Sequence, residues 1–156
     1  MLEVLVISIS KPLLIGLYED KKLIKTYKDE GKTSDVLPQI FEEIISKHTL
    51  DTINYVNTPG SYMAIKVAYV FLKTISITKN IELKACSGFE FNQNSPIKAL
   101  GKKYFININD EKDKNNNVKV DFLDNNTKIH DFELPNVLEK INFSSETLPI
   151  YNLPAV

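Results

Sequence analysis

The stretch INYVNTPGSYMAIKVAYVFLK, which runs from Ile53 to Lys73, decides the predicted fold. The apolar run at its start predicts a strand, and the turn Thr58-Pro59-Gly60-Ser61 ends that strand. Ser61 is a residue type that caps helices, and apolar residues recur beyond it at spacings of three and four. The sequence therefore predicts a helix from Tyr62 to Ile77 with apolar residues on two faces. One face can cover a sheet, and the other needs a second helix or another protein.

The composition is ordinary for a globular protein, and 156 residues fit one domain or one domain with a small appendage. All 19 basic residues are lysines and the net charge is −1, so we expect neither an arginine clamp nor a basic field that attracts nucleic acid. The single cysteine, Cys86, excludes an internal disulfide and favours the cytoplasm. No apolar run is long enough to span a bilayer, and residues 1–10 are typical of a core strand, so we expect no membrane association and no signal peptide.

The patterns over residues 1–92 follow the order strand, strand, strand, helix, strand, helix, strand. The first helix is expected from Ser34 or Asp35, either of which can cap it, to about His48. The strands are expected at 2–9, 13–18, 22–27, 53–56 and 81–86. This is the order of the ribonuclease-H-like fold, which actin and the sugar kinases (the ASKHA group) share. We therefore predict an α/β first lobe, residues 1–92, with a mixed five-stranded sheet and helices.

Residues 93–156 differ from the first part in sequence pattern, and they predict a truncated second lobe of a few strands with a C-terminal tail. Strands are expected at 104–109, 118–123 and 128–133, and a short helix at 136–141. About sixty residues are few for an independent core, so we expect this part to lean on the first. Acidic and amide residues partly resemble a calcium loop, but its glycine and its bidentate glutamate are missing, so a hairpin loop explains them better. These residues are Asp113, Asn115, Asn117, Asp121 and Asp124.

The predicted strand ends lack the acids that catalysis on this fold requires. Serines end the first strand and asparagines end the fourth, so two metal ions would find no carboxylates there. Glu3 lies at the wrong end of the first strand, and the hairpin after it contains neither an acid nor a glycine. We therefore assign no catalytic residue, no metal ligand and no cofactor to the chain itself.

The turn Pro59-Gly60-Ser61 is the one candidate anion contact, because it presents backbone N–H groups at a helix N-terminus. A capped tight turn explains the same residues more simply. If the turn does bind phosphate, the chain is a weak nucleotide-binding or nucleotide-hydrolysing relative of the sugar kinases, with Gly60 and Ser61 at the phosphate.

Residues 58–68, TPGSYMAIKVA, resemble the GPGSFTGLRIG signature of the bacterial TsaB (YeaZ) family. Pro59, Gly60 and Ser61 match, whereas Tyr62 replaces Phe and Lys66 replaces Arg. Three further segments are similar to family motifs: 33–40 to the helix start HTxxLLPxI, 87–90 to SSLEA, and 148–151 to the closing PxYLR. The resemblance covers roughly residues 1–92 and the last few residues. The chain departs from the family at Ile7-Ser8-Ile9-Ser10, where the family has IDTS, and in its shorter second lobe.

Several expectations follow from this resemblance alone. It implies a non-catalytic scaffold subunit of the machinery that makes N6-threonylcarbamoyladenosine at position 37 of tRNA. Such a subunit binds a TsaD-like catalytic subunit through two first-lobe helices and meets tRNA only indirectly. The resemblance also allows for a TsaE-like ATPase as a further partner, for ATP at the boundary between subunits, and for a homodimer when the catalytic partner is absent. A stand-alone interaction module unrelated to tRNA is the remaining alternative.

The two helices carry more apolar surface than one sheet can cover, and we predict that the excess binds the partner. Alternatively, these side chains all pack internally against the second lobe. The candidate interface residues are Val36, Leu37, Ile40, Phe41, Ile44, Tyr62, Met63, Lys66, Tyr69 and Val70.

Overall fold

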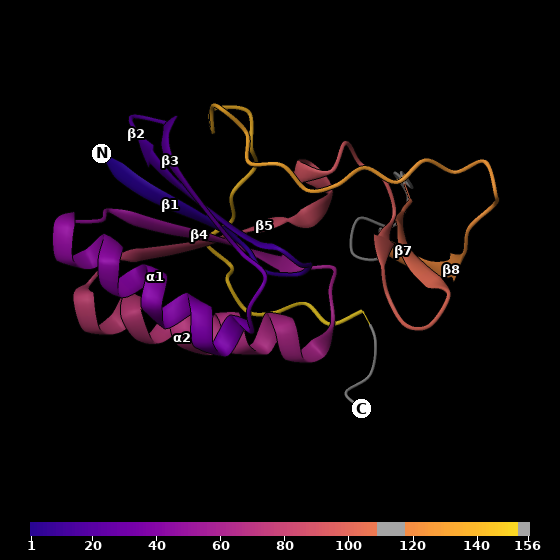
Figure 1. The fold of residues 1–156 in the computed structure, drawn as a ribbon, viewed down its shortest axis with the longest axis horizontal. Helices are drawn as coiled ribbons and strands as arrows, with labels where there is room; N and C mark the ends of the chain where they lie inside the picture. The colour runs from indigo at the N-terminus through magenta and orange to yellow at the C-terminus, as the bar shows by residue number, and fades with distance from the viewer. Residues whose placement is uncertain (109–117, 153–156) are drawn as a thin grey trace.

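The computed structural model describes residues 1–108 and 118–152. Strands β1 to β5 form a mixed five-stranded sheet in the order β3-β2-β1-β4-β5, and β6 to β8 form a three-stranded sheet (Figure 1). In the first sheet β1 pairs antiparallel with β2 and parallel with β4, and β4 pairs parallel with β5. The predicted mixed five-stranded sheet is therefore confirmed. The elements are β1 (Leu2–Ile7), β2 (Leu13–Glu19), β3 (Lys22–Asp29), α1 (Thr33–Lys47), β4 (Thr52–Thr58), α2 (Tyr62–Lys79), β5 (Glu82–Ser87), the 3₁₀ turn η1 (Gly88–Phe91), β6 (Ile97–Lys98), β7 (Lys103–Asn107) and β8 (Val118–Phe122).

Both α-helices cover the same face of the five-stranded sheet (Figure 1). Alternate residues of β1 and β4 point into this layer and meet apolar residues of α1 and α2. Phe41 of α1 and Phe71 of α2 join the helices edge to face, with ring centroids 5.7 Å apart. α2 begins as predicted, because the Ser61 hydroxyl accepts a hydrogen bond from the Ala64 N–H at 3.2 Å.

An extended segment covers the other face of the sheet. We call residues 132–152 the C-terminal strap. It packs Leu138, with Phe132, Leu134, Ile141 and Phe143, on the outward-facing side chains of β1, β2, β4 and β5. The strap is joined to the sheet by scattered backbone bonds, including a pair between Ser144 and Ala85 at 2.8 and 2.9 Å. The Tyr18 hydroxyl also donates to the Pro135 carbonyl oxygen at 2.7 Å. A segment from the second part of the chain thus completes the core of the first lobe.

The small sheet has its own apolar cluster of Phe89, Ile97 and Phe105, to which Ile9 and Phe132 also contribute. β7 pairs antiparallel with both β8 and the short β6, and its residue Phe105 is buried. Ile9 and Phe132 also pack on the cluster between the five-stranded sheet and the strap, so that cluster and the cluster of the small sheet are continuous. The second part leans on the first, as the length of the chain led us to expect.

Several local predictions are wrong in the described residues. Residues 128–133 form no strand and 136–141 no helix. Glu133, Asn136 and Leu138 form backbone hydrogen bonds with the distant residues Phe91, Leu23 and Lys21. Helix α1 begins at Thr33, and Lys32 occupies the capping position without a side-chain bond, so neither Ser34 nor Asp35 caps it. Asp113, Asn115 and Asn117 of the calcium-loop resemblance lie outside the described residues. Neither α-helix in the described part of the chain is long and apolar enough to cross a membrane.

Candidate partner-binding surface

A solvent-open apolar groove runs between α1 and α2 on the side away from the sheet. Its volume is about 480 Å³, and Met63 and Val70 on its α2 side are 61% and 55% exposed. Exposed apolar side chains of this size favour contact with another molecule when they are contiguous. The groove is lined by Thr33, Ser34, Leu37 and Pro38 of α1 and by Met63, Lys66, Val67, Val70, Phe71 and Thr74 of α2.

The groove continues toward the C-terminal ends of both helices. A second hollow shares Pro38 and Phe71 with the first and extends past Phe41 and Ile45 to Lys79. Ile77, in the last turns of α2, is 69% exposed. The apolar surface therefore follows nearly the whole length of the helix pair.

The prediction that Val36, Leu37, Phe41 and Ile44 face outward is wrong. All four are buried and belong to the apolar core beneath the helices. They occupy the α1 stripe that packs on the sheet. Leu37 also lines the groove, and Phe41 also lines the second hollow. These four residues therefore pack internally, as the alternative expected, but they pack against the five-stranded sheet and not against the second lobe.

The remaining candidates divide between half-buried and exposed positions. Ile40 and Tyr69 are half-buried against the core, and the Tyr69 ring lies 6.2 Å from that of Tyr55. Lys66 is exposed, and its ammonium lies 5.3 Å from the centroid of the half-buried Tyr62 ring. With Met63 and Val70, Lys66 lines the groove.

The motif turn is packed tightly against the loop that follows β1. A Cβ atom at Gly60 would approach Ile9 Cγ2 to 2.8 Å, and one at Gly88 would approach Ile9 Cδ1 to 2.6 Å. Pro59 and Gly60 are buried. Ser61 is exposed, and its hydroxyl caps α2 by accepting the hydrogen bond from the Ala64 N–H. Ile9 therefore fills the space between the two glycines, which favours a packing role for Gly60.

The strap ends beside this turn and the first turn of α2. The Ile150 N–H donates to the Asn57 carbonyl oxygen at 3.1 Å, and Thr58 Oγ1 donates to Asn152 Oδ1 at 2.9 Å. Tyr151 stacks on Tyr62 with ring centroids 4.5 Å apart. The motif turn, the start of α2 and the end of the strap thus form one unit.

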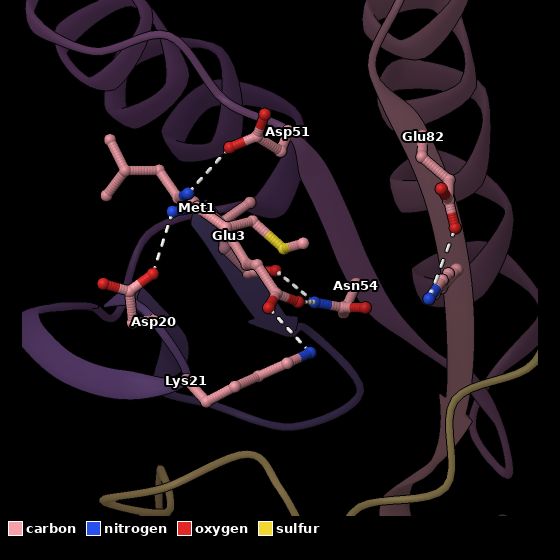
Figure 2. A network of polar contacts seen from close by, with 10 residues as sticks. Met1, Glu3, Asp20, Lys21, Asp51, Asn54 and Glu82 are labelled. Atoms are coloured by element: carbon pink, nitrogen blue, oxygen red, sulfur yellow. Dashed lines mark hydrogen bonds and ion pairs between the residues drawn. The ribbon is translucent and has the colours of Figure 1, made fainter.

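Glu3 lies at the opposite end of the sheet and has a structural role. It is 2% exposed, its carboxylate pairs with Lys21 Nζ at 2.7 Å, and it accepts a hydrogen bond from Asn54 Nδ2 at 3.1 Å (Figure 2). A buried charge is tolerated when it is paired and hydrogen-bonded in this way. No group of three or more potential metal ligands (His, Cys, Asp or Glu) occurs among the described residues.

Cys86 shows no sign of nucleophilic activation. The thiol is buried at the end of β5, and burial raises the pKa of Cys86 well above its ordinary value. A thiol of raised pKa is a poor nucleophile, because the thiolate is the reactive form. Cys86 is therefore a core residue.

No protein-family model matches the chain, and no curated protein matches it either. Solved structures do. The structure titled YeaZ from Pseudomonas aeruginosa superposes with a TM-score of 0.59 at 8% identity, over 99% of this chain and 71% of that one. A second, described as an uncharacterized protein with similarity to peptidase YeaZ from Pseudomonas aeruginosa, has a TM-score of 0.54 at 9% identity and covers 99% and 69%.

These superpositions show the fold class of the chain. The chain has the ASKHA-like α/β fold, which confirms the predicted fold class. More particularly, it has the fold of the YeaZ structures, although at this identity the likeness extends to the fold alone.

The sequence analysis missed the side chains that form the walls of the groove. Six lining residues were not among the candidates: Thr33, Ser34, Pro38, Val67, Phe71 and Thr74. A signal was present in α2, since residues 63, 67, 70 and 74 follow the spacing of three and four that defines one helix face. No comparable signal marks α1.

Proposed function

We propose that this chain is a TsaB-like, non-catalytic subunit that supports a TsaD-like ligase in the threonylcarbamoyladenosine modification of tRNA. Two features support the proposal: the YeaZ-like fold and the motif turn at 58–68 that resembles the TsaB signature. The observation that carries it is the groove between α1 and α2, which leaves Met63 and Val70 exposed. A surface of this kind suits a protein partner, because burying it removes apolar area from water.

The proposal assigns the chemistry to the partner. In the described residues, the carboxyl ends of β1 and β4 present Ser8 and Asn57 where acids would be needed for metal binding. Ile9 packs onto the motif turn, which disfavours the alternative of a phosphate at Gly60 and Ser61. The ligase would then carry the metal and the nucleotide, with ATP at most at the boundary between subunits. A TsaE-like ATPase is a second proposed partner, and tRNA is met through the complex.

The groove is tested by replacing Met63 and Val70 together with aspartate. Ile40 and Tyr69 are less suitable positions, because both pack against the core and their replacement would disturb the fold. The double variant should stay folded and should lose co-purification with the TsaD-like ligase, with a Kd raised at least about tenfold. The matched control replaces Leu100 and Phe122, which are 65% and 62% exposed on the second part. If the groove variant binds as well as the control, the groove is not the interface.

Two further measurements separate the alternatives. The isolated chain should not hydrolyse ATP in the presence of magnesium, whereas a nucleotide-hydrolysing relative of the sugar kinases would. Depletion of the chain should lower the amount of threonylcarbamoyladenosine in tRNA. Unchanged modification would contradict the proposal and favour a stand-alone interaction module. If the ligase is absent, a homodimer through the same groove is expected, and the Met63 and Val70 variant should then be monomeric.

A further inference from the structure

A second concave site lies between the two parts of the chain, and it shares no residue with the groove between α1 and α2. We call it the lysine cleft. One wall is the loop after β1, a second is the start of β6 with β7, and a third is the segment that leads into the strap. Its volume is about 460 Å³, within the range of small-molecule sites. It is lined by Ile9, Ser10, Lys11, Pro12, Leu14, Lys28, Pro96, Ile97, Lys98, Tyr104, Ile129, His130, Asp131 and Phe132.

The charges around the lysine cleft are unbalanced. Lys11, Lys28 and Lys98 line it, and none of them lies within 4.0 Å of an acidic side chain in the described part of the chain. Asp131 is the one acidic lining residue. With His130 neutral, three lysines and one aspartate give a net charge of 3 − 1 = +2. Lysine is a common point-charge ligand for phosphate, and a cleft lined by an excess of one charge strengthens the local potential.

The floor of the lysine cleft is apolar. Ile97 is buried, and Leu14 is nearly so, while Ile9 and Phe132 are half-buried beside them. Tyr104, on the neighbouring strand β7, adds an aromatic side chain. Such a floor suits an apolar or planar body, and a cationic rim suits an anionic group attached to it.

The walls of the lysine cleft are fixed by hydrogen bonds. The His130 N–H donates to Ser95 Oγ at 3.0 Å, and Ser95 is buried and bonded to Asn92 through both its hydroxyl and its carbonyl. Just beyond the cleft, the Glu133 N–H donates to the Phe91 carbonyl oxygen at 2.9 Å. These contacts hold the segment around His130 against the loop that follows η1, so the site is formed before any ligand binds.

From this geometry we infer that the lysine cleft binds a phosphomonoester of a small, largely apolar or planar molecule. A phosphomonoester carries about −1.5 to −2 charges at pH 7, which matches the excess of the lining residues. The body of the ligand lies on the floor around Ile97 and Phe132, and its phosphate meets the three lysines. The inference does not rest on the proposed function, since the site is separate from the groove and uses none of its residues.

The test is calorimetric titration of the full chain with phenyl phosphate, adenosine 5′-monophosphate, inorganic phosphate, phenol and adenosine. At least one of the two phosphomonoesters should bind saturably, and inorganic phosphate and the uncharged bodies should bind at least about tenfold more weakly. If only adenosine monophosphate binds, the natural ligand is a nucleotide. If phenyl phosphate also binds, the ligand belongs to a broader class of phosphomonoesters. In the triple variant K11Q/K28Q/K98Q, affinity should fall at least about tenfold.

The matched control is K102Q/K119Q/K128Q, which removes the same charge from exposed lysines outside the cleft. Its affinity should stay within about twofold of the unmodified chain. Amide shifts of the unmodified chain should be confined to residues 9–11, 97–98 and 129–132, a readout that needs no variant. Equal weakening in both triple variants, equal binding of the uncharged bodies, or no saturable binding of either phosphomonoester would overturn the inference. The inference would also be overturned if the chain bound a short RNA but neither of the two phosphomonoesters.

Discussion

Replacing Leu138 with alanine tests whether the C-terminal strap is part of the core of the first lobe. Leu138 is 1% exposed and packs among residues of β1, β2 and β4, all of them more than eighty positions earlier in the chain. Truncating a buried leucine to alanine costs about 2–5 kcal/mol of unfolding free energy, because apolar contacts are lost and a cavity remains. For a chain of this size, 1 kcal/mol lowers Tm by about 2–4 °C, so a decrease of about 4–20 °C is expected.

The assay is equilibrium unfolding in urea, with thermal melts, followed by circular dichroism or tyrosine fluorescence. The control is Val137→Ala, since Val137 precedes Leu138 and is 43% exposed, and it should change stability by less than about 0.5 kcal/mol. Both variants should unfold in a single transition. If Leu138→Ala is no less stable than Val137→Ala, the strap does not contribute to the core and the reasoning is refuted.

Two further predictions concern the motif turn and alkaline pH. Gly60→Ala should lower the unfolding free energy by about 1–3 kcal/mol through overpacking against Ile9. Combined with Ile9→Ala, which removes the clashing atoms, its cost should be smaller than in the unmodified chain, and additive losses in the same assay would contradict this. Burial raises the pKa of the Tyr18 and Tyr55 hydroxyls and of the Cys86 thiol above the ordinary values of 10.0 and 9.0. The unfolded chain therefore loses these protons first, and the unfolding free energy should fall above about pH 9 by up to about 1.4 kcal/mol per pH unit for each group. Tyr55→Phe should make that slope shallower, and an unchanged slope would argue against the burial of this hydroxyl.

The first lobe was predictable because its signals are local. Ser61 follows a Pro-Gly turn and precedes an apolar repeat, so the strand, the turn and the capped helix can all be inferred from a window of about twenty residues. The order of the strands then restricts the topology, because parallel neighbours require crossover helices. The outward face of α1 was not predictable in the same way. Val36 and Phe41 are apolar in any arrangement, and only the position of the sheet shows that their stripe faces inward.

The strap and the lysine cleft could not be predicted, for a different reason. The partners of the strap are distant: the Leu138 N–H donates to the Lys21 carbonyl oxygen at 2.9 Å, across 117 positions. A segment without a period of its own gives no sign of such bonds, which is why a strand and a helix were wrongly expected there. Lys11, Lys28 and Lys98 likewise come from separate elements, and only the fold brings them to one concave surface.

The position of Leu138 in the core has a consequence for the biosynthesis of the chain. β1 is translated about 130 residues before the strap side chains that cover its outer face. At about 5–20 residues per second, Leu5 and Ile7 stay exposed to water for roughly 7–26 s on the nascent chain. Chaperones that bind apolar segments have that interval in which to act. A ribosome that stalls before residue 132 would release a sheet with one face uncovered, a species prone to aggregation.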